Sequence, residues 1–108
     1  MTADLLPGQR YSAVVAQGVR MRAMKKVLNE VRKERWRQDA KWGVQNHPPL
    51  YWLGILGEEF GEVSKAMIED QPRSTREELI QVAAVAVAAV ECGDRMEWWR
   101  EDEEAPDA

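Results

Sequence analysis

The sequence YWLGILGEEFGEVSKAMIED, residues 51–70, decides the interpretation of the whole chain. Four apolar residues repeat at helical spacing in steps of four, three and four, which predicts a buried seam: Leu56, Phe60, Val63 and Met67. Glu59 and Glu62 fall on the neighbouring line, together with Ile55 and Ala66. A carboxylate at the edge of a core costs free energy unless it is paired or bound to a cation. The stretch therefore predicts a helix whose two carboxylates need a partner.

Length and composition predict one cytoplasmic, all-α domain. The chain has 108 residues, 44% of them hydrophobic, and no alternating run of β-branched residues that would indicate strands. The single Cys92 excludes an internal disulfide and a zinc site built from several cysteines, and it is typical of a reducing compartment. No signal peptide is visible, and the longest apolar run, Val82–Val90, is about half a membrane span. We expect no membrane partner.

The two halves of the chain carry opposite charge. Residues 1–50 hold ten Lys or Arg against four Asp or Glu, whereas residues 51–108 hold five against fifteen. The basic residues are scattered, with only Lys25-Lys26 and Arg32-Lys33 adjacent, so nucleic acid is the less favoured partner. Complementary halves that fold together explain the pattern better, and an acidic half with paired glutamates suits a divalent cation.

The N-terminal part predicts a long helix after a flexible arm at Met1–Tyr11. From Ser12 a helical pattern runs to Trp42, with a core line formed by Met21, Met24, Leu28 and Val31. The same line then reaches Arg35 and Gln38, so an apolar stripe turns polar without changing face. Two interpretations stay open: either these side chains meet water, or they point into a cavity.

The loop at residues 43–50 contains Pro48-Pro49 and the only histidine, His47, whose usual role in such a place is structural. In the helix that follows, glycines carry a propensity cost and indicate close packing against another helix. They are Gly54, Gly57 and Gly61.

The last helix is predicted to open at Ser74-Thr75, where Ser74 with Glu77 and Thr75 with Glu78 match the capping-box pattern. Residues 79–90 are apolar on nearly every face, which three helices of one chain do not easily cover. We therefore expect a helical bundle completed by a second subunit, as a homodimer or tetramer. Residues 94–108 read as a short docking segment around Trp98-Trp99 and an acidic tail.

Two pairs of oxygen-bearing side chains indicate the chemistry. Glu59 and Glu62 lie three apart on one predicted helix, and Glu78 and Gln81 lie three apart on the next. If the pairs face each other, they form an oxygen-only site that suits Mg²⁺, with Mn²⁺ as an alternative, and Mg²⁺ commonly shares its shell with substrate phosphates. A glutamate-rich solvated face is the competing interpretation.

These residues carry a resemblance to a known family. Over residues 34–91 the chain resembles the MazG-like branch of the all-α nucleoside triphosphate pyrophosphohydrolases. The matching segments are RWRQ (35–38), KWGVQNH (41–47), WL (52–53), LGEEFGEV (56–63), KA (65–66) and EELIQVAAV (77–85). The resemblance places the family domain at residues 12–93 and implies hydrolysis of a nucleoside triphosphate to a monophosphate and pyrophosphate.

The resemblance also implies roles for individual residues. The family pattern, E-x-x-E on one helix and E-x-x-D on the next, matches Glu59, Glu62 and Glu78 as magnesium ligands, while Gln81 stands where the family has Asp. Glu58 matches the extra glutamate, and Glu58 or Glu59 is expected to accept the proton of the attacking water. Substrate contacts are expected from six further residues: Arg35, Gln38, Lys41, Trp42, Gln45 and Lys65.

Gln81 keeps a second class of function open. An amide offers a carbonyl oxygen to magnesium but removes one negative charge and is not a base. The alternative is a non-catalytic helical module that binds a nucleotide or a protein through a degenerate metal site.

Overall fold

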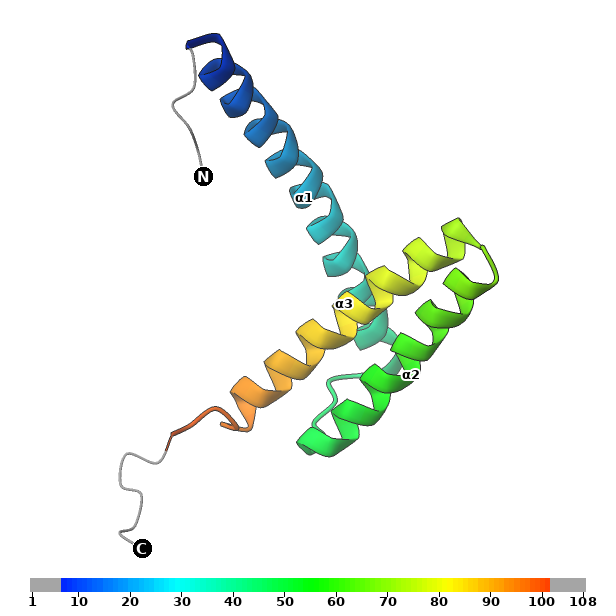
Figure 1. Ribbon diagram of the computed structural model, residues 1–108. Helices are drawn as coiled ribbons and strands as arrows, with labels where there is room; N and C mark the ends of the chain where they lie inside the picture. The colour runs from blue at the N-terminus through cyan, green and yellow to red at the C-terminus, as the bar shows by residue number, and fades with distance from the viewer. Residues whose placement is uncertain (1–6, 102–108) are drawn as a thin grey trace, which may run out of the picture. The chain divides into compact units, whose positions relative to one another are not determined.

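The computed structural model describes residues 7–101, with side chains from Ser12 onward. Three α-helices make up the fold: α1 (Pro7–Trp42), α2 (Pro49–Ile68) and α3 (Pro72–Arg95) (Figure 1). No strand occurs among these residues, which confirms the predicted all-α class. The chain divides into two compact units, Met1–Glu30 and Val31–Ala108, and the boundary lies inside α1.

In the first unit, α1 begins at Pro7, five residues before the predicted start at Ser12. The cause is Pro7 itself, because proline suits the first turn of a helix, where its missing N–H has no role. The predicted flexible arm at Met1–Tyr11 is thus helical from Pro7 onward, and residues 1–6 lie outside the described part. The apolar side chains of the predicted line, Met21, Met24 and Leu28, are exposed in this structure.

The second unit places α2 and α3 side by side and antiparallel (Figure 1). Asp70 makes the turn between them with a positive φ of 53°, a left-handed conformation that Asp and Asn tolerate better than most residues. The core between the two helices combines fully buried and partly buried side chains: Trp52, Val85, Ala88 and Cys92, with Ile55, Leu56, Ala89 and Trp98 packed against them.

The buried face of α2 differs from the predicted seam. Val63 is buried as expected, but Phe60 and Met67 are 67% and 56% exposed. The helix instead buries Trp52, Val63 and Ala66, so the core line passes through the position of Glu59. The sequence alone favoured the line with the most large apolar residues. The structure turns α2 so that the glutamate line faces α3.

The predicted capping boxes are also absent. Helix α3 begins at Pro72, and its N-terminal cap, Gln71, makes no side-chain capping hydrogen bond. Ser74 and Thr75 therefore lie inside the helix, where the Thr75 hydroxyl donates a hydrogen bond of 2.9 Å to the carbonyl oxygen of Gln71. Because Thr75 does not cap the helix, Glu78 is not engaged in the predicted capping box.

The chain folds back at the end of α3 and brings the tryptophan pair onto the helix. Trp98 packs against the core, and the Trp99 indole Nε1 donates a hydrogen bond of 2.9 Å to Asp94. Gly93 makes this return possible, because a Cβ at position 93 would lie 2.3 Å from Cζ2 of Trp99. The tryptophan segment predicted to dock thus packs on its own chain.

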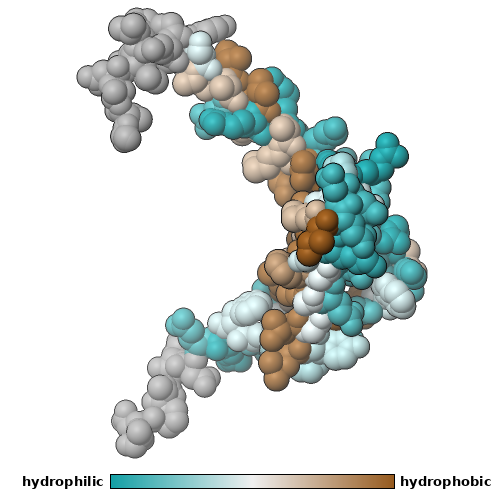
Figure 2. Space-filling model, turned by 45° about the vertical axis from the view of Figure 1, so that its right-hand side comes forward, coloured by the Kyte–Doolittle hydropathy of each residue, from teal (hydrophilic) through white to brown (hydrophobic). Residues whose placement is uncertain are grey.

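Many large apolar side chains stay exposed in the described part of the chain, and Figure 2 shows hydrophobic patches on one face. In the second unit they lie along α2 and α3, and include Leu53, Phe60, Met67, Leu79, Val87 and Val90. None of the described helices is long and apolar enough to cross a membrane.

A Gly93→Ala substitution should destabilise the second unit by about 1–3 kcal/mol, because the new methyl group overlaps both indole rings. The free energy of unfolding is measured by urea denaturation, and tryptophan fluorescence reports the release of Trp98 and Trp99. Gly18→Ala is the matched control: its Cβ meets only the Arg22 side chain at 3.8 Å, so we expect a gain of about 0.5–1 kcal/mol. Equal effects of the two substitutions would contradict the packing described for Gly93.

Candidate functional site

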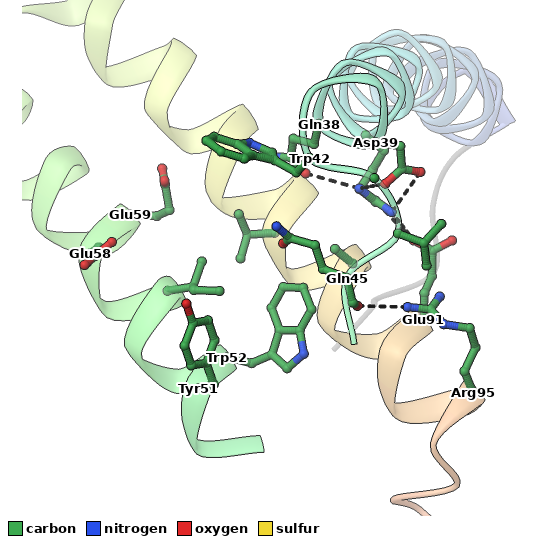
Figure 3. Close-up of a pocket in the computed structure, with 16 residues that line it drawn as sticks. Gln38, Asp39, Trp42, Gln45, Tyr51, Trp52, Glu58, Glu59, Glu91 and Arg95 are labelled. Atoms are coloured by element: carbon green, nitrogen blue, oxygen red, sulfur yellow. Dashed lines mark hydrogen bonds and ion pairs between the residues drawn. The ribbon is translucent and has the colours of Figure 1, made fainter. Parts of the chain in front are cut away.

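A cavity of about 490 Å³ lies in the second unit and is lined by the end of α1, the following loop, α2 and α3 (Figure 3). Its lining is amphipathic, with tryptophan, tyrosine and aliphatic side chains beside amides and charged groups. The lining residues are Arg35, Gln38, Asp39, Trp42, Gly43, Val44, Gln45, Tyr51, Trp52, Ile55, Glu58, Glu59, Val85, Ala88, Glu91 and Arg95. Such a mixture suits an organic ligand that has both apolar and polar parts.

Arg35 holds α1 against α3 on one side of the cavity. Its Nε and Nη2 donate hydrogen bonds of 3.0 and 2.7 Å to Glu91, and its Nη1 lies 3.1 Å from Asp39. Burial lowers the pKa of Arg35, but the hydrogen bonds and charges of Glu91 and Asp39 outweigh this effect and raise it. Two carboxylates therefore offset the charge of this arginine within the structure.

The loop after α1 is fastened to the last turns of α3. Arg95 donates hydrogen bonds to the Asn46 side chain at 3.0 Å and to the Gln45 carbonyl at 3.1 Å. The Cys92 thiol donates to the carbonyl oxygen of His47 at 3.5 Å. In the view of Figure 3, the Gln45 side chain lies between the groups carried by α2 and those carried by α3. The loop thus forms a fixed wall of the cavity.

His47 has a structural role in this loop. Its ring stacks on Tyr51, with 4.2 Å between the ring centroids, and meets Trp52 edge-on at 5.4 Å. Trp52 is 4% exposed, and its Nε1 has no hydrogen-bond partner among the described residues. The aromatic contacts place Tyr51 and Trp52 on the cavity wall.

Carboxylates gather where α2 faces α3. Burial raises the pKa of Glu59, and the negative charges of Glu78, Glu62, Glu58 and Glu34 raise it further. These five side chains come from all three helices, so the helix packing brings together groups that are up to 44 positions apart in the sequence.

Two carboxylate oxygens of this cluster lack a partner. Glu59 Oε2 and Glu78 Oε2 are buried, and neither has a hydrogen-bond partner within the described part of the chain. An unsatisfied buried carboxylate oxygen is costly, and a bound cation removes that cost. Hard oxygen ligands of this type fit magnesium. In residues 7–101, however, no three His, Cys, Asp or Glu side chains form a group that could hold a metal ion in this conformation.

The structure separates the predicted site residues into two groups. Six of them line the cavity: Arg35, Gln38, Trp42, Gln45, Glu58 and Glu59. Five do not: Lys41, Glu62, Lys65, Glu78 and Gln81. Of the latter, Glu62 and Glu78 belong to the carboxylate cluster. The Lys41 ammonium lies 4.8 Å from the centre of the Trp42 ring. Lys65 is exposed, and Gln81 is partly buried.

Sequence reasoning missed Asp39, Glu91 and Arg95, which line the cavity and join its walls. The Asp39 position, four residues after Arg35, was a readable signal for an ion pair on one helix. Glu91 and Arg95 carry no such signal, because their partners lie 56 and about 50 residues away. Comparisons of this chain with protein-family models, curated proteins and solved structures found no match.

Glu59→Gln should stabilise the chain at neutral pH in the absence of divalent cations. The raised pKa of Glu59 means that the folded state binds more protons than the unfolded state between the ordinary and the raised pKa, so stability falls as pH rises through that window. We expect the variant to lose this part of the pH dependence and to gain a few degrees in Tm, since ~1 kcal/mol shifts Tm by roughly 4–8 °C.

Urea denaturation between pH 4 and 8, with a chelator present, measures the pH dependence of stability, and thermal denaturation under the same conditions measures Tm. The exposed Glu77, next to Glu78 on α3, supplies the matched control Glu77→Gln, which should leave the pH dependence unchanged. Identical pH profiles for wild type and Glu59→Gln would contradict a buried, repelled carboxylate at this position.

Proposed function

We propose that this chain is a magnesium-dependent nucleoside triphosphate pyrophosphohydrolase that converts an NTP or dNTP to the monophosphate and pyrophosphate. The observation that carries the proposal is a pair of buried carboxylate oxygens, on Glu59 and Glu78, that have no hydrogen-bond partner among the described residues. They belong to two helices, and Glu59 also lines the cavity. A metal-assisted reaction on a phosphate-bearing organic substrate requires carboxylates that bind a cation and, beside them, an amphipathic cavity for the organic part.

Glu59, Glu62 and Glu78 would hold the magnesium, with the Gln81 carbonyl oxygen as a neutral fourth donor. When bound, magnesium would offset phosphate charge and make a water molecule more acidic. In the reaction, the water oxygen forms a bond to the α-phosphorus while the bond from that phosphorus to the bridging oxygen breaks, and pyrophosphate leaves. Glu58 or Glu59 accepts the proton of the water.

The remaining cavity residues suit the nucleoside part of the substrate. Trp42, Tyr51 and Trp52 offer aromatic surfaces, and the amides of Gln38 and Gln45 both donate and accept hydrogen bonds. Arg95 donates a hydrogen bond to the backbone carbonyl of Gln45, so the side-chain amide of Gln45 projects from an ordered part of the cavity wall. We assign these residues to base and ribose contacts.

The activity test incubates the purified full chain with each NTP and dNTP plus magnesium and measures released pyrophosphate. We expect release from at least one nucleotide, loss of release with EDTA, and a loss of about 100-fold or more in Glu62→Ala and Glu78→Ala, whose ligands the chemistry requires. Magnesium with nucleotide should also raise Tm in the wild type and much less in Glu62→Ala.

Gln81 favours one alternative, a non-catalytic module that binds nucleotide through the same site. The variant Gln81→Asp separates the two functions. Pyrophosphate from Gln81→Asp but not from the wild type would assign the native chain to binding without turnover. No pyrophosphate from either protein, together with no magnesium-dependent change in Tm, would overturn both assignments.

We further propose that the chain functions as a homodimer or higher oligomer through the outward faces of α2 and α3. Leu53, Phe60 and Met67 recur every seven residues on the exposed side of α2. A Cβ added at Gly54, Gly57 or Gly61 would meet nothing within 4 Å in the described chain. Among the described residues, no other helix thus comes within 4 Å of a Cβ at the glycines predicted to pack closely against a helix, and a second copy would supply one.

Phe60→Glu should convert the oligomer to a monomer, because it places a charge at the centre of the exposed α2 face. Sedimentation equilibrium or light scattering measures the mass, and circular dichroism verifies that the helices persist. Arg73→Glu, an exposed change in the first turn of α3, is the control and should leave the mass unchanged. A wild type that is still monomeric at about 100 µM would contradict the proposal.

A further inference from the structure

The proposed substrate carries three phosphates, yet the most buried arginine of the site is already committed. Arg35 contacts Glu91 and Asp39, and its Nη1 also donates a hydrogen bond of 3.3 Å to Gln38. Releasing it toward a phosphate would leave Glu91 and Asp39 without their partner and loosen α1 from α3. Lys41, the other expected cation on α1, lies over the Trp42 ring. Lys65, the expected cation on α2, is exposed. A second arginine of α1 offers a further phosphate contact.

Arg37 lies on the opposite flank of α1 from Arg35. Two residues along an α-helix turn the side chain by about 200°, so a helix that presents Arg35 to Glu91 on α3 presents Arg37 to the other side. On that side Arg37 forms a two-point contact with Glu34, in which Nε donates to Oε1 at 2.9 Å and Nη2 donates to Oε2. The Arg37 side chain is 58% exposed, so it remains open to a ligand.

Glu34 connects this arginine to the carboxylate cluster. It follows the buried Val31 by three residues and precedes Gln38 of the cavity wall by four, so it lies on the face that α1 turns toward α2 and α3. Its side chain is only 14% exposed. Its negative charge is also the smallest of the five causes that raise the pKa of Glu59.

We infer that Arg37 is a substrate-binding residue that contacts the phosphates leaving as pyrophosphate, and that Glu34 holds its guanidinium beside the carboxylate cluster. A guanidinium contacts two oxygens of a phosphate as it does those of a carboxylate, so the substrate takes over the contact that Glu34 makes in the free protein. The exchange takes this partner from Glu34, but it breaks no contact between helices, because both residues lie on α1. This inference rests on the proposed function, because it assigns a residue of the same site.

The test measures binding of magnesium pyrophosphate and of nucleoside monophosphates to the full chain by isothermal titration calorimetry. Arg37→Ala should weaken pyrophosphate binding by about 10-fold or more, as expected for loss of a charge-assisted contact, and should leave monophosphate binding unchanged. Arg37→Lys should keep part of the affinity, since one charge remains without the two-point geometry. In turnover assays on an active nucleotide, KM should rise more than kcat falls.

Arg32→Ala is the matched control. Arg32 stacks on Trp36 at 5.3 Å on another face of the same helix, and its loss should leave pyrophosphate binding unchanged. Circular dichroism and Tm of each variant separate a binding effect from misfolding. Unchanged pyrophosphate affinity in Arg37→Ala, or a wild type that binds no pyrophosphate, would overturn the inference.

The two proposals fail in different ways. If pyrophosphate binds through Arg37 but no nucleotide is hydrolysed, the phosphate-binding role of Arg37 stands and the hydrolase function falls. If nucleotides are hydrolysed at the same rate and KM in Arg37→Ala, the hydrolase function stands and the inference falls.

Discussion

The placement of Glu59 on the buried line of α2 is the constraint on which the site depends. Trp52, Val63 and Ala66 on that line pack into the chain, and the rigid helix therefore carries Glu59 toward α3. There it meets Glu78, and burial with repulsion raises the pKa of Glu59. Folding of one chain creates this unfavourable arrangement and does not relieve it. Under the proposed function, bound magnesium relieves it.

The charges around the cavity are divided between two flanks of α1. On one flank, Arg35 is balanced by Glu91 and Asp39, and this closed ion-pair network joins two helices. On the other flank, Glu34 and its neighbours on α2 and α3 leave an excess of negative charge that Arg37 only partly offsets. Balanced ion pairs such as those of Arg35 are typical of a structural contact between helices. An excess of charge of one sign is typical of a binding site.

The sequence predicted the three helices because their period is a local signal. It placed the starts of α1 and α3 after the prolines at which these helices begin, and it misjudged how α2 is turned. Four large apolar residues on one line outweighed the line of Glu59, although Phe60 and Met67 are exposed. The rotation of a helix about its axis depends on the helices packed against it, and the sequence of one helix does not specify those contacts. The Glu59–Glu62 pair was readable from its three-residue spacing. The Arg35–Glu91 pair, 56 residues apart, exists only once α1 and α3 meet.

The exposed face of α2 and the buried glutamates both cost the single chain stability. Three glycines in a helix interior cost roughly 2–3 kcal/mol together, a large share of the 5–15 kcal/mol that stabilises a typical domain. Nothing within the described chain packs against Gly54, Gly57 or Gly61 to explain that cost. The buried oxygens of Glu59 and Glu78, which have no partner in the described part of the chain, are a second uncompensated cost. Both are explained if the functional state includes a second copy on the outer face of α2 and a cation on its inner face, so that stability and activity depend on the same partners.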